Sequence, residues 1–324
     1  MEHDDDRQIG PFVLDERLDS GASAVVWRGR HRRTGVPVAV KIFDRGGVDP
    51  DKLAEHLEAE VQALAQLDHP NIISLFDYGR IDEPRGLIEQ QESQRIPYLV
   101  MEHADGGTIR DDGELSEGFG SWNKIKRVLM DVLDALAYAH ANDVIHRDIK
   151  PANVLVSRRS TPDAAVDPDT EPRIVLTDFG LAEAFRGQPR VRTQQRGSDD
   201  VGTPYYMAPE QFRSQWRSFG PWTDLYAVGC LAYEIVSGQP PFSGGNYFEV
   251  AQSHVDAPVP DLHPRLSVPG TFEDWVEKLL EGYERGTADD PVLAVGGRMV
   301  PAWVAGKPSF LPEEFYWLVG VTHR

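Results

Sequence analysis

Cysteine is nearly absent from this chain of 324 residues, because Cys230 is the single one. A lone cysteine excludes an intramolecular disulfide and fits a reducing compartment such as the cytoplasm. Long apolar runs are also missing, and none reaches the roughly 20 residues of a membrane-spanning helix. The acidic start, with aspartate at positions 4–6, differs from the basic-then-apolar pattern of a signal peptide. We therefore expect a soluble cytoplasmic protein without a membrane span.

Positive charge is in short supply. Lys and Arg number 33 against 52 Asp and Glu, which gives a formal net charge of -19. Such a balance repels a phosphate backbone, so nucleic acid is not an expected partner. The hydrophobic share of 40% and the charged share of 26% are typical of globular proteins. Because 324 residues exceed what one hydrophobic core normally serves, we expect two lobes.

Hydrophobic spacing places strands early in the chain and helices late. Strand-like segments are residues 12–30 with an interruption at 19–24, then 36–43, 72–76, 97–102, 154–156 and 174–176. Helical spacing covers residues 51–67, 122–141 and 223–237, and a further helix begins at Trp275. The polar stretches 82–96 and 157–172 are predicted loops. This order favours an α+β fold with two lobes and a ligand between them.

Three short strings, in this order, carry the chemistry. Residues 146–155 read His-Arg-Asp-Ile-Lys-Pro-Ala-Asn-Val-Leu, residues 178–180 read Asp-Phe-Gly, and residues 208–210 read Ala-Pro-Glu. The ordered set matches the protein-kinase signature. From about residue 9 to 281, the chain resembles eukaryotic-like serine/threonine protein kinases of the bacterial type.

The resemblance implies a bilobal protein-kinase-like fold of the α+β class. Its β-rich N-lobe would span residues 9–103 and its mainly helical C-lobe residues 104–281. Residues 1–8 are polar and are expected to be a disordered N-terminus. Residues 282–324 form a divergent C-terminal segment with no counterpart in the family pattern.

The resemblance also assigns roles at the catalytic end, where phosphoryl transfer depends on positioning and charge neutralisation. Asp148 would accept the proton of the substrate hydroxyl, and Lys150 would steady the γ-phosphate. Asn153 and Asp178 would supply oxygen ligands to Mg²⁺, with Mn²⁺ as an alternative. A single loop aspartate is usually a turn or cap residue, but the set of Asp148, Lys150, Asn153 and Asp178 at these spacings is hard to explain in that way.

The loop expected over the nucleotide phosphates is degenerate. Against the pattern G-x-G-x-x-G-x-V, the chain has Asp19, Gly21, Ala24 and Val26, so only the middle glycine is kept. By itself this stretch would be an ordinary turn between two strands. The extra charge of Asp19 would either lie near the phosphates or point to solvent.

The strand that follows restores the nucleotide interpretation. Val-Ala-Val-Lys at residues 38–41 resembles the strand whose lysine, here Lys41, holds the α- and β-phosphates. Glu60 falls at the position of its acidic partner, whereas Glu58 points to another face of the same helix. The resemblance gives a nucleotide-binding set of Gly21, Val26, Ala39, Lys41, Met101, Glu102, Ala104 and Leu155, whose apolar members would also suit an ordinary core.

The activation segment of the resemblance runs from residue 178 to 210. Asp199 occupies the usual phosphosite position, so either it mimics a phosphate or Ser198 or Thr193 is autophosphorylated. A solvated acidic loop is a further alternative. Asp224 resembles the residue that ties the helix at 223–237 to the catalytic loop.

One part of the family pattern is missing. Glu210 normally pairs with a buried arginine of a late D-P-x-x-R-P motif, which this chain lacks. A buried unpaired carboxylate is costly. Either Arg285 or Arg298 takes that place, or the lower lobe is altered.

The sequence therefore predicts an ATP-dependent serine/threonine protein kinase that transfers the γ-phosphate to Ser/Thr hydroxyls of proteins and phosphorylates itself. The alternative is a pseudokinase scaffold that binds a nucleotide or partner without turnover. A small-molecule phosphotransferase is a more distant alternative. Homodimers through the N-lobe occur in the family, and nothing in the sequence specifies one.

Overall fold

The computed structural model describes most of the segments that carry the motifs. These are residues 7–21, 24–43, 58, 61–82, 87–88, 96–110, 120–159, 161, 164, 171–179, 204–213, 219–281, 292–295 and 298–301. The chain divides into two compact units. The first unit contains the chain to Asp105 and the described residues from Ser157 to Arg173. The second unit contains the described residues of Gly106–Val156, Ile174–Gly180 and Thr203–Arg324.

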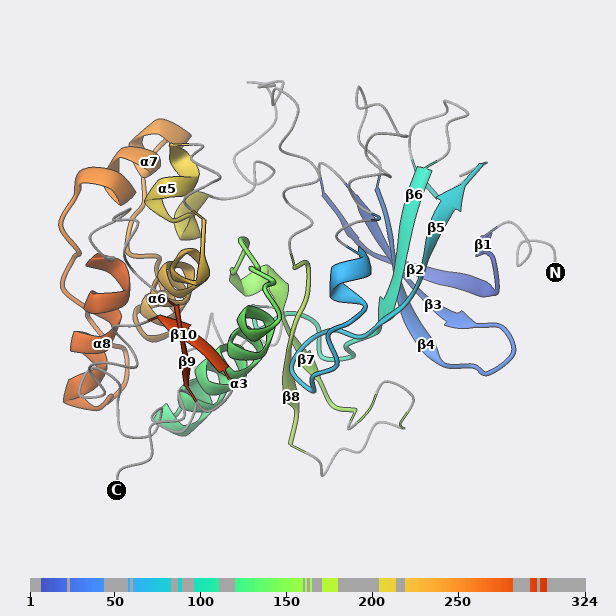
Figure 1. Ribbon diagram of the computed structural model, residues 1–324, viewed down its shortest axis with the longest axis horizontal. Helices are drawn as coiled ribbons and strands as arrows, with labels where there is room; N and C mark the ends of the chain where they lie inside the picture. The colour runs from blue at the N-terminus through green and yellow to red at the C-terminus, as the bar shows by residue number, and fades with distance from the viewer. Residues whose placement is uncertain are drawn as a thin grey trace. The chain divides into compact units, whose positions relative to one another are not determined.

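The first unit is built on an antiparallel sheet with the strand order β1-β2-β3-β4-β6-β5 (Figure 1). Its strands are β1 (Gln8–Ile9), β2 (Phe12–Ser20), β3 (Val25–His31), β4 (Pro37–Ile42), β5 (Leu75–Ile81) and β6 (Ile96–Glu102). The sequence placed Gln8 in a disordered N-terminus. It instead pairs with Val13, because β2 offers free backbone groups at the start of the chain.

One face of this sheet is the core of the first unit. Val38, Val40 and Ile42 alternate along β4 and pack with Trp27 of β3 and Val100 of β6. This is the period of two that a half-buried strand requires. The predicted loop at 82–96 contributes to the same core, since Leu87 is buried there and its carbonyl accepts a hydrogen bond from Trp27 Nε1 at 3.2 Å.

The structure corrects one predicted strand of the first unit and describes part of one predicted helix. The strand predicted at 72–76 actually runs from Leu75 to Ile81. It was misplaced because Phe76, Asp77 and Tyr78 are all exposed, so this edge strand lacks an apolar alternation. Of the helix predicted at 51–67, residues 58 and 61–64 are helical, and residues 51–57 and 59–60 lie outside the described residues.

The second unit is mainly helical (Figure 1). Its helices are α3 (Trp122–Ala141), α5 (Pro209–Phe212), α6 (Pro221–Ser237), α7 (Tyr247–Asp256) and α8 (Gly270–Glu281), with 3-10 turns η1 (Pro151–Asn153) and η2 (Pro204–Tyr206). Strands β7 (Val154–Ser157) and β8 (Arg173–Leu176) pair with each other. The hairpin of β9 (Val292–Val295) and β10 (Arg298–Pro301) follows, and β10 lies against α3. The α+β class predicted from the sequence is confirmed.

Helix α6 is the centre of the second unit. It is apolar along most of its length and buried on nearly all sides, and Cys230 is fully buried within it. Gly229 lets α8 approach closely, because a Cβ there would lie 2.8 Å from Leu279 Cβ. Helix α8 begins at Gly270, five residues before the predicted start at Trp275. Its first turn buries Phe272, whose ring lies 4.9 Å from that of Trp122.

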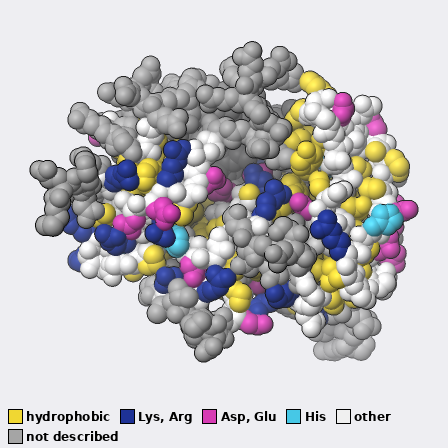
Figure 2. Space-filling view, turned by 180° about the vertical axis from the view of Figure 1, so that it is seen from behind, with side chains coloured by type: hydrophobic (Ala, Val, Ile, Leu, Met, Phe, Trp, Pro, Cys, Tyr) yellow, Lys and Arg dark blue, Asp and Glu magenta, His cyan; other side chains and the backbone are white. Residues whose placement is uncertain are grey.

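Two further observations concern the surface. On the face in Figure 2, Lys and Arg side chains lie among Asp and Glu side chains over the described surface. None of the helices in the described part of the chain combines the length and hydropathy that crossing a membrane requires.

The close approach of β2 and β3 yields a testable prediction. A Cβ at Gly29 would lie 2.4 Å from the Val13 carbonyl oxygen, a backbone atom that cannot move aside. We expect Gly29→Ala to lower the free energy of unfolding by about 1–3 kcal/mol in urea titrations. Gly270→Ala is the control, because a Cβ there meets nothing within 4 Å. Equal stability of the two variants would contradict this account.

Candidate active site

The catalytic motif forms the loop between α3 and β7 in the second unit. Three described non-glycine residues have positive φ, namely Asp143 (60°), Arg147 (67°) and Asp178 (65°). Such backbone is uncommon for side chains with a Cβ and persists where the surroundings enforce it. Two of the three residues belong to the motifs at 146–155 and 178–180, so these segments are held in shape by specific contacts.

Asp224 of α6 supplies the main contacts. Its carboxylate accepts hydrogen bonds from the His146 N–H at 2.8 Å and the Arg147 N–H at 2.6 Å. It also lies 2.8 Å from His140 Nε2, which must carry the proton because a carboxylate only accepts. Asp224 ties the helix to the loop as the resemblance predicted.

The charge of Asp224 is stabilised despite complete burial. Burial alone would raise the pKa of its carboxyl group, but the hydrogen bond and electrostatic attraction of His140 and the hydrogen bond from the Arg147 N–H outweigh it. The result is a lowered pKa, which keeps Asp224 ionised.

His146 is a structural residue beneath the loop. Its ring centroid lies 4.3 Å from that of Phe179. Its Nδ1 accepts the Asp148 N–H at 3.3 Å, and its Nε2 lies 2.9 Å from the Thr177 carbonyl oxygen. These contacts fit a neutral ring with the proton on Nε2. Burial lowers the pKa of His146, which favours the same neutral form.

Asp148, Lys150 and Asn153 form a compact cluster. Lys150 Nζ lies 2.8 Å from Asp148 Oδ2. Asn153 Nδ2 donates to the Asp148 carbonyl oxygen at 2.7 Å and to Asp148 Oδ2 at 3.0 Å. The Asp148 and Lys150 side chains are 30% and 23% exposed, so they are fixed yet accessible to a ligand. The structure thus brings together three of the four residues predicted for the catalytic end, and Asp178 follows β8 in the same unit.

Asn153 and Asp178, the residues predicted to hold a metal ion, suit a hard divalent cation. With Nδ2 of Asn153 bonded to Asp148, its Oδ1 remains as an oxygen donor, and Asp178 offers a carboxylate. The described residues contain no cluster of three metal-binding His, Cys, Asp or Glu side chains. Mg²⁺ does not need one, because it is commonly held by one or two carboxylates together with substrate phosphates and water. The donor set therefore fits the predicted ion.

Four of the residues predicted to bind the nucleotide lie on one face of the sheet in the first unit. Val26 is the cross-strand partner of Lys41, and Ala39 is the partner of Met101. Directly opposed residues share a face, as do residues two apart on a strand. These four therefore lie on the face opposite the core cluster around Val40. Glu102 ends β6 and Ala104 follows it.

The degenerate loop between β2 and β3 is closed by its own backbone. The Gly21 N–H donates to the Ala24 carbonyl oxygen at 3.0 Å. The carboxylate of Asp19 accepts the Ser20 N–H at 2.7 Å, and both residues are exposed. Asp19 is thus exposed and bonded to the neighbouring backbone, and the effect of its charge on the phosphates stays a prediction.

Some predicted site residues are placed apart or not described. Leu155 lies on β7 in the second unit, where it bridges to Thr108. Glu60 lies outside the described residues, so its pairing with Lys41 stays a prediction. The same holds for the phosphosite hypotheses at Thr193, Ser198 and Asp199.

Glu210, the residue expected to pair with the missing arginine motif, is hydrogen-bonded from α6. The Thr223 hydroxyl donates to Glu210 Oε1 at 2.7 Å, and Glu210 is only 8% exposed. Next to it, Gln211 Nε2 donates to the Arg147 carbonyl oxygen at 2.9 Å. Arg285 and the side chain of Arg298 lie outside the described structure, so neither predicted substitution is tested.

Comparisons with known proteins agree with this geometry. The chain matches the protein kinase domain family over residues 12–284. The chain belongs to the protein kinase family. The bilobal kinase fold and the resemblance read from the three motifs are thereby confirmed.

The most similar relatives include bacterial kinases. A probable serine/threonine-protein kinase PknB of Bifidobacterium longum is 33% identical over 266 residues, which is 82% of this chain and 35% of the relative. The serine/threonine-protein kinase PknB of Mycobacterium tuberculosis is 32% identical over 250 residues, or 77% of this chain and 36% of the relative. That of Mycolicibacterium smegmatis is 31% identical over 83% of this chain and 39% of the relative. The match thus spans little more than a third of each relative.

Sequence reasoning missed several residues that shape this kinase domain. His140 bonds to Asp224, and the Thr177 carbonyl oxygen bonds to His146. Thr223 bonds to Glu210, and Gln211 bonds to the Arg147 carbonyl oxygen of the loop. Each lies outside the three motif strings or, like Gln211, directly after one. No spacing signal marks them, since their contacts join segments that are far apart in the sequence.

Asp224 gives the first prediction for the site. In Asp224→Asn, the side-chain NH₂ would replace one acceptor oxygen among buried N–H donors. We expect the free energy of unfolding to fall by about 3 kcal/mol or more in urea titrations. Asp256→Asn, at the exposed end of α7, is the matched control and should be neutral. An Asp224→Asn protein as stable as this control would refute the role of the carboxylate.

His146 gives a prediction for pH. Its pKa is lowered from 6.5 in the folded protein, so below pH 6.5 the unfolded chain takes up a proton that the folded chain excludes. Stability from the neutral ring is therefore present above this pH and is lost as the pH falls. We expect the stability difference between wild type and His146→Gln to shrink from pH 7.5 to 5.5, by up to about 1.4 kcal/mol per pH unit. A difference independent of pH would show that His146 does not remain neutral.

Proposed function

We propose that this protein is an ATP-dependent serine/threonine protein kinase that transfers the γ-phosphate of ATP to Ser/Thr hydroxyls of proteins, including its own. The observation that carries the proposal is the cluster of Asp148, Lys150 and Asn153, in which one carboxylate oxygen meets an ammonium group at 2.8 Å and an amide at 3.0 Å. The relatives' names as serine/threonine kinases support it.

In this proposal, the cluster orients the reacting groups. Asp148 accepts the proton of the attacking hydroxyl, while the Lys150 ammonium balances its charge and approaches the γ-phosphate. Asn153 and Asp178 hold Mg²⁺, or Mn²⁺ in its place, which neutralises phosphate charge. The neutral His146 and ionised Asp224 beneath the loop keep these side chains in position.

The nucleotide is assigned to the residues predicted from the sequence. Lys41, paired with Glu60, contacts the α- and β-phosphates, and Gly21 lies in the loop over them. Backbone groups of Glu102 and Ala104 contact adenine. The apolar faces of the ring contact a set of four residues, Val26, Ala39, Met101 and Leu155.

Autophosphorylation tests the proposal. We expect purified protein with ATP and Mg²⁺ to gain phosphate, detected by mass spectrometry on residues 186–203, which contain Thr193 and Ser198. Asp148→Asn should lower the rate at least about 100-fold, because it removes the proton acceptor. The matched control is Asp143→Asn in the same loop, where the exposed aspartate has φ of 60° and asparagine tolerates that backbone well.

The outcomes separate the alternatives. Equal rates in wild type and Asp148→Asn would refute the assigned role of Asp148. Absence of phosphate in wild type, together with a Mg²⁺-dependent thermal shift on adding ATP, would identify a nucleotide-binding scaffold. The replacement of two glycines by Asp19 and Ala24 in the phosphate loop is the feature that would explain that result.

A further inference from the structure

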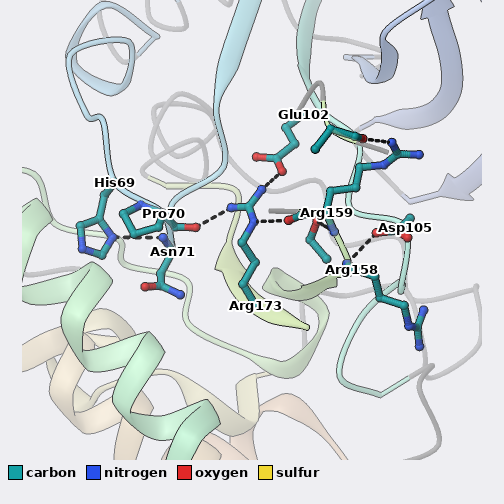
Figure 3. Close-up of polar contacts among 10 residues, drawn as sticks. His69, Pro70, Asn71, Glu102, Asp105, Arg158, Arg159 and Arg173 are labelled. Atoms are coloured by element: carbon teal, nitrogen blue, oxygen red, sulfur yellow. Dashed lines mark hydrogen bonds and ion pairs between the residues drawn. The ribbon is translucent and has the colours of Figure 1, made fainter. Parts of the chain in front are cut away.

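Arg173 joins three segments of the first unit that are distant in the sequence. It is the first residue of β8, and its guanidinium group points toward Glu102 and Pro70 (Figure 3). Nη2 bonds to the Glu102 carboxylate, Nη1 donates to the Pro70 carbonyl oxygen, and Nε donates to the Arg159 carbonyl oxygen at 2.9 Å. The Arg173 side chain thus bonds to the end of β6, to the turn at 69–71 and to the segment that follows β7.

The ion pair with Glu102 is buried. The Glu102 side chain is 0% exposed and that of Arg173 is 15% exposed. Burial raises the pKa of Glu102, and the charge and hydrogen bond of Arg173 oppose that rise. The second carboxylate oxygen, Oε2, has no hydrogen-bond partner within the described structure. Glu102 therefore depends on Arg173 for its charge to be tolerated.

The carboxylate of Glu102 does not lie on the nucleotide face of the sheet. Glu102 pairs with Val38, whose side chain belongs to the core cluster, whereas its neighbour Met101 pairs with Ala39 on the opposite face. The Glu102 N–H is also engaged, because it donates to the Ser74 carbonyl oxygen at 2.9 Å. The Glu102 side chain is thus held by Arg173, and its backbone N–H is held by the Ser74 carbonyl oxygen.

We propose that Arg173 is a positioning residue for adenine binding, which fixes the backbone of the segment from Glu102 to Ala104 through the Glu102 carboxylate. This inference rests on the proposed function, in which that segment contacts adenine. An arginine suits the task because its planar group makes three directed bonds at once, whereas a lysine offers a point charge. Small displacements of a binding group have large effects on the bound ligand.

The experiment compares ATP affinity with turnover. We expect Arg173→Met to raise the KM for ATP by about tenfold, and the Kd for ADP with Mg²⁺ in calorimetry by a similar factor. The kcat should stay within about threefold, because the catalytic loop is held by Asp224 and His146. Arg30→Met is the matched control, since its ion pair with Asp15 lies in the same sheet but is half exposed, and both constants should stay within about twofold.

Two further variants keep the test decisive. Arg173→Lys retains the charge and the fold and should raise the KM by less than Arg173→Met. Glu102→Gln combined with Arg173→Met should be no worse than Arg173→Met alone, because both changes break the same pair. If Arg173→Met does not fold, Arg173→Lys and Glu102→Gln carry the comparison.

The outcomes that would overturn the inference are specific. A lowered Tm with unchanged KM and Kd in the Arg173 variants would show a merely structural role. Multiplying effects in the double variant would show that Arg173 does not act through Glu102. A wild type that binds ADP and phosphorylates itself while the Arg173 variants bind equally well would remove this inference alone. A wild type that binds no nucleotide would remove the proposed function as well.

Discussion

The buried carboxylate of Asp224 is the contact on which the catalytic loop depends. It lies in the first turn of α6, where the helix dipole favours a negative charge, and α6 is fixed on nearly all sides by the core. Two successive N–H groups, those of His146 and Arg147, converge on this one side chain. The backbone that directs both N–H groups at Asp224 includes the positive φ of Arg147. The shape of the loop is therefore set from inside the second unit.

This support explains how the reactive side chains are both ordered and accessible. Beneath the loop, the ring of Phe179 packs against the neutral ring of His146, whose Nδ1 accepts the Asp148 N–H. Above it, Asp148 and Lys150 remain partly exposed. In the proposed function, a preorganised cluster of this kind would need little rearrangement when charge moves during phosphoryl transfer, which is how electrostatic catalysis lowers a barrier.

The protein is strongly acidic. Among the residues that the structure describes, the buried acids Glu102, Glu234 and Glu210 have partners of different chemical kinds. Glu102 has the guanidinium group of Arg173. Glu234 accepts from the Tyr206 hydroxyl and meets Arg110, and these contacts oppose the rise in its pKa that burial causes. Glu210 accepts a hydrogen bond from the neutral hydroxyl of Thr223, which lies on α6 directly before Asp224.

Much of this could be read from the sequence alone. The family, the α+β class, the span of α3 and the identities of Asp148, Lys150, Asn153 and Asp178 follow from local patterns, because motif spacing and helical periodicity are properties of neighbouring residues. The edge strand β5 was misplaced because its exposed residues carry no alternation. Only the tertiary structure showed the contacts of Arg173 with Glu102 and of Thr223 with Glu210. These pairs are 71 and 13 residues apart, and a buried charge finds its partner through packing rather than through spacing along the chain.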